Sequence, residues 1–440
     1  MPDNEDSEKT REFMREKIVK QPLSGREIAK RLVLYVCLAA LFGVIAAFSF
    51  VLAKPLADRY LGTGEEEEST SIRFTKDEPE SSAAESVPET TAEETDAEEA
   101  EEERIQKSVE DAIKKYTMTP EHVNAMYAAI REIGQQADKG IVTVRSGKQQ
   151  ADIFGNPIEN TGDYAGAVIA QTRGEYMIFT SAEAVRDASS ILVAFYDGTR
   201  VAGTVKQIDE VMDMAVVSVP VKDIPEQVKN MTSVLELGNS YSVRAGDPMI
   251  AVGGPAGAVH SISFGTITYV ARNVPMTDGM ARILYADMES NSRVGTFLLN
   301  LSGQLIGWTS DAYYSEGATA HTMAVGISDY KEILEKMSNG IPCAYFGIHG
   351  QEVSDSLAEL GDMPKGVYVT EVVNDSPAYN AGIQNGDVII GFAGTEITTF
   401  KELQTQIENT SSGVPVFVKV MRRGREGYTE LDYTVDIRAR

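Results

Sequence analysis

The sequence of 440 residues predicts a mainly β protein that follows an N-terminal transmembrane helix. From Gly140 onward, short apolar segments with the two-residue period of β-strands succeed one another. Turn signals such as Asp197-Gly198 and Gly253-Gly254-Pro255 separate these segments at short intervals, as in a sandwich or barrel. Nearer the N-terminus, twenty-two consecutive apolar residues carry no charge, which is typical of a membrane-spanning helix.

The membrane helix is expected over residues 32–53. At about 1.5 Å per residue, this run is long enough to cross a hydrocarbon core of about 30 Å. The basic residues that precede it are Lys17, Lys20, Arg26, Lys30 and Arg31, whereas only Lys54 and Arg59 follow closely. The positive-inside rule therefore predicts a cytoplasmic tail, residues 1–31. A cleavable signal peptide is the alternative, but its apolar core is usually shorter, and Ala53-Lys54-Pro55 is a poor cleavage site.

The charge of the chain is concentrated in one segment. The formal net charge is -26, and residues 65–103 hold seventeen acids against Arg73 and Lys76. Rich in Glu, Ser, Thr, Ala and Pro, residues 54–103 are expected to form an acidic, disordered linker. The remaining domains are only mildly acidic, which argues against nucleic-acid binding. Cys37 and Cys343 lie too far apart in sequence and context to indicate a structural disulfide.

Residues 104–138 are expected to form two amphipathic helices. Ile105, Val109 and Ile113 recur at a four-residue step. A second helix should begin after Thr119-Pro120, an N-cap followed by proline at the first helical position. Its apolar face is Val123, Met126, Tyr127, Ile130 and Ile133. Both helices are expected to pack on the following domain.

Strands are predicted in the following part of the chain over the ranges 141–144, 165–170, 176–180, 191–196, 201–207, 214–219 and 249–252. The stretch from Tyr285 to Trp308 adds two more strands joined by a tight turn. In it, Asp287 is followed by a polar run, then by Phe297-Leu298-Leu299-Asn300, a Ser-Gly turn and Gln304 to Trp308.

This stretch resembles the nucleophile region of the HtrA (Do-like) serine protease family, and three further blocks fit the same family. They are Tyr176 to Val185, Asp209 to Val219 and Ala251 to Thr268, in the family's order. The resemblance implies a chymotrypsin-like double β-barrel over residues 139–339. HtrA proteins are also commonly trimers built through N-terminal contacts, which implies an assembly role for the helices before the barrel.

The family's catalytic positions carry altered residues here. Set from Leu298-Leu299-Asn300 backwards, the serine position falls on Val294, in a segment one residue shorter than the family pattern. The histidine position falls on Glu183, and only Asp213 keeps the family's aspartate. Acyl transfer needs a hydroxyl or thiol held against a base, and the oxyanion hole needs a well-placed glycine-rich turn. No functional catalytic residue is therefore expected.

Two alternatives remain open at this stage. Glu183 and Asp213 could lie close enough to share a proton or to hold a divalent ion, although no third ligand is visible. Ser290 or Ser292 could be a displaced nucleophile, but both lack a histidine. The four histidines, His122, His260, His321 and His349, lie outside the base block. No cofactor and no metal site are predicted.

The end of the barrel domain has its own family match. His321 to Asp329 resembles the strand that lines the primary specificity pocket. Ser328 to Ser338 should then form a closing helix with Tyr330, Ile333, Leu334 and Met337 on one face, before a linker at Asn339-Gly340-Ile341-Pro342.

Residues 343–438 resemble an α+β PDZ domain, and here the motifs are intact. Tyr345, Phe346, Gly347 and Ile348 fit the carboxylate-binding loop, and Ser376-Pro377-Ala378 with Ala381 to Ile389 is the most characteristic block. Phe400 to Thr410 should be the groove helix, with Leu403 and Ile407 lining the groove. A peptide would add as a strand after Ile348, with its terminal carboxylate on the loop amides.

Together these features predict a membrane-anchored, proteolytically inactive HtrA-like protein of a bacterial cell membrane. Its partners would be exposed or C-terminal peptides of exported, unfolded proteins, bound outside the cytoplasm. Two alternatives are an active envelope endopeptidase and a regulatory subunit of active HtrA trimers, in either a homo- or a hetero-trimer.

Overall fold

The computed structural model describes residues 71–77, 119–151, 157–288, 293–310 and 322–440. The contacts between residues divide the chain into two units, Met1–Thr70 and Ser71–Arg440, and all the described residues belong to the second unit. Several predictions lie outside the described residues. They concern the tail 1–31, the helix 32–53, most of the linker, the helix near Ile105, and Ser290, Ser292 and His321. In the part of the chain that the structure describes, no helix is both long and apolar enough to span a membrane.

The first β-sheet has seven strands in the order β5-β4-β1-β2-β3-β7-β6. The strands are β1 Ile141–Ala151, β2 Pro157–Gln171, β3 Glu175–Thr180, β4 Ser190–Ala194, β5 Arg200–Ala202, β6 Thr204–Asp209 and β7 Met214–Pro220. Although β5 and β6 are its two ends, Gly203 alone joins them in the chain. A Cβ on Gly203 would lie 2.7 Å from Val217 of β7 and 3.2 Å from Val193 of β4. The sheet is therefore rolled up, with glycine at its tightest corner.

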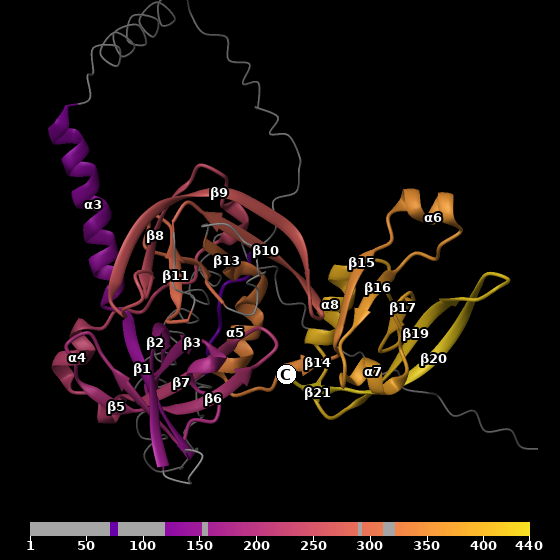
Figure 1. Ribbon diagram of the computed structural model, residues 1–440, viewed down its shortest axis with the longest axis horizontal. Helices are drawn as coiled ribbons and strands as arrows, with labels where there is room; N and C mark the ends of the chain where they lie inside the picture. The colour runs from indigo at the N-terminus through magenta and orange to yellow at the C-terminus, as the bar shows by residue number, and fades with distance from the viewer. Residues whose placement is uncertain (1–70, 78–118, 152–156, 289–292, 311–321) are drawn as a thin grey trace, which may run out of the picture. The chain divides into compact units, whose positions relative to one another are not determined.

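The second β-sheet is a closed barrel in the order β10-β13-β12-β11-β8-β9 (Figure 1). Its strands are β8 Pro248–Gly253, β9 Ser261–Met276, β10 Gly279–Ala286, β11 Thr296–Leu299, β12 Leu305–Trp308 and β13 Thr322–Gly326. Strands β11 and β12 pair antiparallel, with Phe297 opposite Trp308. The Asn300 side chain accepts hydrogen bonds from the backbone of Ser302 and Gln304 and so fixes the turn between them. The predicted pair of strands and its tight turn are confirmed.

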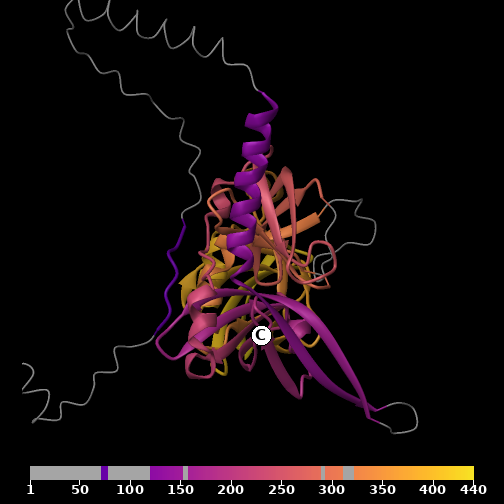
Figure 2. The ribbon, with the colours of Figure 1, turned by 90° about the vertical axis from the view of Figure 1, so that its left-hand side faces the viewer.

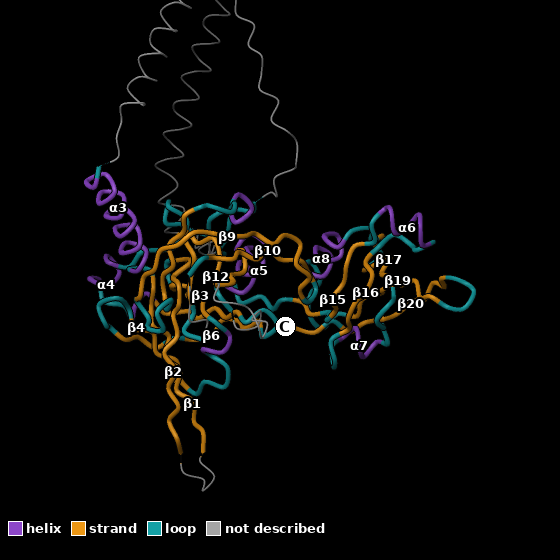
Figure 3. The backbone as a smooth tube through the Cα atoms, turned by 45° about the horizontal axis from the view of Figure 1, so that its top comes forward, coloured by secondary structure: helices purple, strands orange, loops and turns teal. Residues whose placement is uncertain are grey.

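Most predicted strands of the first sheet are present, with two differences. The single strand predicted over 201–207 is wrong, because the chain bends at Gly203 into β5 and β6. Strands β1 and β2 are longer than predicted, since their polar ends pair with each other as far as Ala151 and Pro157. These ends continue past the neighbouring strands as a two-stranded ribbon (Figures 2 and 3).

The two longer helices of this barrel domain lie at its two ends in sequence, and one short helix lies between its two sheets. Helix α3, Pro120–Asp138, begins at Thr119, whose backbone N–H donates to the Nδ1 atom of His122. Its C-terminal half packs through Ile130 and Ile133 on the core, whereas Met126 and Tyr127 are exposed. The predicted face therefore packs over only half its length. The short helix α4, Glu226–Met231, follows β7.

Helix α5, Lys331–Ser338, closes the domain after a 3-10 turn, Ile327–Tyr330. The face predicted for this helix is buried as expected. Its buried residues include Tyr330, Ile333, Leu334 and Met337.

A short part of the predicted disordered linker is ordered against α5. The backbone N–H of Ile72 donates to Asn339 and that of Phe74 to Glu335. Lys331 pairs with Asp77 at 2.8 Å. Ile72 is buried in the core of the barrel domain, and this apolar burial offsets the entropy of ordering the segment. The prediction of a continuous linker over 54–103 is therefore wrong for residues 71–77.

One hydrophobic core joins the two sheets. Phe179 of β3 lies 5.8 Å from Phe297 of β11 and 5.3 Å from Trp308 of β12, measured between ring centroids. Tyr330 packs edge-on against the same Trp308 at 5.3 Å. Because β3 and β11 are held together in this way, the chain segments that leave them face each other.

The C-terminal domain is a sheet in the order β15-β16-β17-β19-β20, with a separate pair of strands, β14 and β21. Its strands are β14 Ala344–Tyr345, β15 Ile348–Glu352, β16 Val367–Val372, β17 Val388–Phe392, β18 Thr395–Glu396, β19 Pro415–Arg423, β20 Tyr428–Asp436 and β21 Arg438–Ala439. Its helices are α6 Asp355–Gly361, α7 Pro377–Ala381 and α8 Phe400–Glu408. Helix α8 begins with a capping box between Thr399 and Glu402, so it starts at Phe400, where the sequence predicts the groove helix.

Candidate functional site

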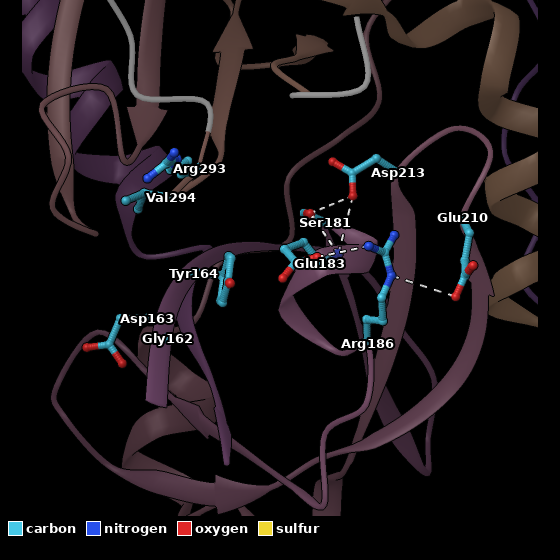
Figure 4. Close-up of a pocket in the computed structure, with 10 residues that line it drawn as sticks. All are labelled: Gly162, Asp163, Tyr164, Ser181, Glu183, Arg186, Glu210, Asp213, Arg293 and Val294. Carbon is cyan, nitrogen blue, oxygen red and sulfur yellow. Dashed lines mark hydrogen bonds and ion pairs between the residues drawn. The ribbon is translucent and has the colours of Figure 1, made fainter. Parts of the chain in front are cut away.

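The residues predicted at the degenerate catalytic positions line one pocket. Its volume is about 580 Å³, and it lies where β3, the β6–β7 turn and the segment before β11 meet (Figure 4). The lining residues are Gly162, Asp163, Tyr164, Ser181, Glu183, Arg186, Glu210, Asp213, Arg293 and Val294. The fold thus brings Glu183, Asp213 and Val294 to one pocket.

Asp213 is held by hydrogen bonds from hydroxyl groups. It lies in the turn before β7 with φ of 50°, a left-handed conformation that Asp tolerates better than most residues. Its Oδ1 atom accepts from the Ser181 hydroxyl at 2.7 Å, and its Oδ2 atom accepts from the Ser310 hydroxyl at 3.1 Å. The residue that would orient a histidine in a protease here fixes two serines instead.

Glu183 presents its backbone, and not its carboxylate, to Asp213. It lies in a 3-10 helix, Ala182–Ala184, and its N–H donates to Asp213 Oδ1 at 3.3 Å. Its half-exposed carboxylate pairs with Arg186 at 3.0 Å, and Arg186 lies 3.7 Å from Glu210 (Figure 4). This geometry does not support the proton-sharing pair of Glu183 and Asp213. In the described residues, no three His, Cys, Asp or Glu side chains are gathered as metal ligands.

Val294 forms an apolar wall of the pocket. Its carbonyl oxygen accepts from the backbone N–H of Ala165 at 2.6 Å, and Gly295 follows with φ of 92°. A Cβ on Gly254 would lie 2.2 Å from Val294 Cγ1, so the valine side chain depends on glycine at that position. Val294, the predicted serine position, is therefore an apolar side chain packed on the backbone of the β8–β9 loop.

The histidines that the structure describes have other partners. His122 bonds to Thr119 at the start of α3, and His260 lies 3.1 Å from Asp138. His349 lies 3.1 Å from the hydroxyl of Thr277. None of these three lines the pocket. Cys343 is also distant from it, and burial raises the pKa of its thiol to about 11, which makes it a poor nucleophile.

The strand predicted to line a specificity pocket is β13, and four of its five residues are buried. Ser328, which follows it, donates its hydroxyl to Asp77 at 2.6 Å. The ordered linker segment 71–77 thus contacts the end of this strand.

The second candidate site is the loop Tyr345–Ile348 of the C-terminal domain. The backbone N–H groups of Phe346, Gly347 and Ile348 converge, and Gly347 has φ of 92°. A Cβ on Gly347 would lie 2.1 Å from the Cβ of Ser376, so only glycine fits. Three convergent N–H groups form a site for a carboxylate. Leu403 and Ile407 of α8 are buried in the hydrophobic cluster beside this loop.

Sequence reasoning missed the residue that fills this site. The carboxylate of Asp278, in the β9–β10 turn, accepts from all three N–H groups at 2.7 to 3.0 Å. Arg440 lies 3.9 Å from the same carboxylate and 3.3 Å from Asp209. Burial raises the pKa of Asp278, and Arg440 and the three N–H groups oppose that shift. The only sequence signal was Asp278-Gly279 between two apolar segments, a hairpin turn.

Comparisons with known proteins match both domains. The family described as trypsin-like peptidase domain matches residues 165–307, and the PDZ domain family matches residues 344–432. The probable periplasmic serine endoprotease DegP-like of Hahella chejuensis is 29% identical over 294 residues. That alignment covers 64% of this chain and 60% of the relative. The serine protease Do-like HtrA of Bacillus subtilis is 28% identical over 310 residues, or 65% of this chain and 68% of the relative.

A solved structure shares the fold. It is an alanine variant of the HtrA-type protease AlgW with a decapeptide, at 19% identity and a TM-score of 0.50. The similarity covers 71% of this chain and 97% of that one. With a trypsin-like peptidase domain followed by a PDZ domain, and with DegP-like and HtrA relatives, the chain is similar to the HtrA/DegP proteases.

Proposed function

We propose that this protein is a proteolytically inactive HtrA family member that binds peptides through its PDZ domain. The observation that carries the proposal is the pocket itself. Where the family pattern has histidine and serine, the pocket holds Glu183, whose carboxylate pairs with Arg186, and the apolar side chain of Val294. A serine protease requires a hydroxyl and a base within hydrogen-bond reach of each other.

Asp213 supports the same proposal. In a triad the aspartate accepts a hydrogen bond from histidine and stabilises its charged form. Here both of its carboxylate oxygens accept from serine hydroxyls, and one also accepts from the backbone N–H of Glu183. These bonds stabilise the turn between β6 and β7, which is a structural role.

Peptide binding would use the intact features of the PDZ domain. The loop Tyr345–Ile348 presents three backbone N–H groups, and α8 places Leu403 and Ile407 in the apolar cluster beside it. A peptide would add as a strand along β15 and place its terminal carboxylate on the loop. The C-terminal segments of unfolded exported proteins have this chemistry, and an exposed internal segment could add only as a strand.

The cellular setting belongs to the same proposal. The apolar run 32–53, with its basic N-terminal flank, would anchor the chain in the bacterial cell membrane with residues 1–31 in the cytoplasm. One relative is named periplasmic, which supports an extracytoplasmic position for the two domains. There the protein would act as an adaptor or regulator in protein quality control, alone, as a homotrimer, or as a subunit of mixed HtrA trimers.

Cleavage of unfolded casein by the purified full-length protein tests the loss of activity. Glu183→Ala, Asp213→Ala and Ser292→Ala variants are run in parallel, with an active HtrA protease as the positive control. We expect no turnover above a buffer blank in any of them. The relatives are named as proteases, so the competing function is an envelope endopeptidase. Casein cleavage by the unmodified protein that is lost in Ser292→Ala or Glu183→Ala would establish an endopeptidase. It would contradict the proposed loss of proteolytic activity.

Binding is tested separately with a library of C-terminal decapeptides. Each is synthesised with a free carboxylate and with an amidated end, and binding is followed by fluorescence anisotropy. We expect binding only to free carboxylates, because amidation removes the charge and one of the oxygens that the loop N–H groups bind. Equal binding of both forms would contradict recognition by the loop.

A further inference from the structure

The carboxylate-binding loop of the PDZ domain holds a carboxylate from its own chain. Asp278 lies at the tip of the β9–β10 hairpin, between Met276, the last residue of β9, and Gly279, the first of β10. Its Oδ2 atom accepts from Phe346 at 2.8 Å, and its Oδ1 atom accepts from Gly347 at 2.7 Å and Ile348 at 3.0 Å. The residue is 1% exposed. All three N–H groups that would receive a peptide terminus are therefore occupied.

The backbone of Asp278 is bonded as well. Its N–H donates to the carbonyl oxygen of Ile348 at 2.8 Å. Strand addition to a sheet edge is built from bonds of this kind, because an added strand exchanges N–H and C=O groups with the edge. Asp278 thus combines a carboxylate in the loop with a backbone bond to the first residue of β15, as the last residue of a bound peptide would.

The other side of the hairpin tip, residues Thr277–Met280, contacts the groove helix. The N–H of Met280 lies 3.3 Å from the side-chain oxygen of Gln404 on α8. The Met280 side chain packs against the hydrophobic cluster of the PDZ domain, which includes Leu403 and Ile407. A Cβ on Gly279 would lie 3.0 Å from Gln404, so glycine allows the tip to approach α8 closely. Thr277 contacts strand β15 instead, because its hydroxyl lies 3.1 Å from His349.

We propose that the hairpin tip is an internal ligand of the PDZ domain, in which Asp278 takes the place of the C-terminal residue of a peptide. The inference rests on the proposed peptide-binding function and deepens it. External ligands of two chemical classes would compete with the tip: chain ends with a free carboxylate and an apolar side chain, and Asp-Gly turns within a chain. Binding of either class displaces the β9–β10 hairpin of the barrel domain.

Competition makes a quantitative prediction. If the tip occupies the loop in nine molecules of ten, the apparent affinity for an external ligand falls about tenfold, because only the free fraction can bind. The alternative is that the hairpin tip is a fixed structural contact between the two domains, which would not compete with an external ligand. It would leave the loop unable to bind a separate ligand, with or without the Asp278 carboxylate.

The test uses the full-length protein and a probe copied from its own chain. The probe is a fluorescent peptide of residues 274–283, closed into a ring by cysteines added at both ends. A matched peptide carries Asn in place of Asp278. The protein variants are Asp278→Ala and Asp278→Asn. The control is Asp197→Ala, another Asp-Gly hairpin turn, whose carboxylate accepts from Thr199 within its own turn. Circular dichroism verifies folding of each variant.

We expect the cyclic peptide to bind Asp278→Ala at least about tenfold more tightly than the unmodified protein, and Asp197→Ala to bind it like the unmodified protein. The Asn peptide should bind none of them. Should the Asp278 variants fail to fold, Gln404→Ala loosens the tip without altering the loop. Because the cyclic probe would lose the same contact with Gln404, free C-terminal decapeptides are titrated into this variant instead, and a gain of about twofold to threefold is expected. Equal binding to unmodified and variant proteins, or binding to no folded variant, overturns the inference.

The same samples separate this inference from the proposed function. Free C-terminal decapeptides are titrated into Asp278→Ala beside the cyclic probe. If the probe binds and no decapeptide does, the hairpin is an internal ligand and general C-terminal peptide binding fails. If decapeptides bind and the probe does not, the proposed function stands and the internal ligand is wrong.

Discussion

The pocket between the two β-sheets and the loop Tyr345–Ile348 are both sites of a kind that binds chain segments. They differ in the groups that form them, which are side chains in the pocket and backbone N–H groups in the loop. A serine protease site depends on three side chains, and here Glu183 and Val294 stand at the positions predicted for two of the three. The loop depends on backbone N–H groups, held by the conformation of Gly347 and the space beside Ser376. A site made of side chains loses its chemistry by substitution, whereas a site made of backbone persists while the fold does.

The largest expected effect breaks the backbone site. Gly347→Ala places a methyl group 2.1 Å from the Cβ of Ser376 in a left-handed conformation. We expect a loss of about 2–4 kcal/mol in the free energy of unfolding, from strain and overpacking together. Peptide binding should be lost with it. Urea unfolding of the full-length protein, followed by circular dichroism, measures the change.

The matched control is Gly413→Ala. Gly413 has φ of 82° but no atom within 4 Å of its Cβ position, so the variant has the conformational strain without the clash. Its cost should be about 1 kcal/mol. Equal costs for the two variants would show that the loop does not require close approach to Ser376.

A smaller effect is expected from Asp213→Ala in the pocket. The substitution removes the acceptor for the hydroxyls of Ser181 and Ser310 and places alanine at φ of 50°. We expect a loss of about 1–3 kcal/mol, because Ser310 is buried and would lack this bond. Thermal unfolding measures the loss, while decapeptide binding should not change. A large change in peptide affinity would mean that the two sites are coupled.

Glu183→Ala should have almost no effect on stability. The Glu183 side chain is 49% exposed, and exposed pairs such as that with Arg186 contribute about 0–1 kcal/mol. The expected change in thermal unfolding is therefore within experimental error. Glu226→Ala, which removes a similar exposed pair with Lys229, is the control. A loss well above that of the control would give Glu183 a role beyond this pair.

The smallest expected effect comes from restoring the side chains of the pocket. A Glu183→His, Val294→Ser double variant returns the family's residue types, with Asp213 already present. We expect no casein turnover above the parent. Asp213 is bonded to two serine hydroxyls, and the segment before β11 is one residue shorter than the family pattern. Turnover that appears on restoration would show that the backbone of the active site has survived, which would narrow the contrast between the two sites.

The sequence by itself predicted the order of the domains, most strands, the three pocket positions and the loop Tyr345–Ile348. Strand periods and turn signals are local, so β3, β7 and β8 could be predicted from neighbouring residues. Motif spacing brought Glu183, Asp213 and Val294 to one pocket, because a shared fold fixes where those positions lie. Leu403 and Ile407 were predicted as groove residues from the resemblance to a PDZ domain, and both are buried on α8.

Only the tertiary structure decided which groups fill these sites. The pairing of Glu183 with Arg186, the docking of Ile72 on the barrel domain and the bonds from the loop to Asp278 join separate elements. Asp278 and Gly347 are 69 residues apart. A local pattern shows that Asp278-Gly279 makes a turn, but not what the turn touches. That contact depends on the packing of the hairpin against α8 and β15, which is a property of the folded chain.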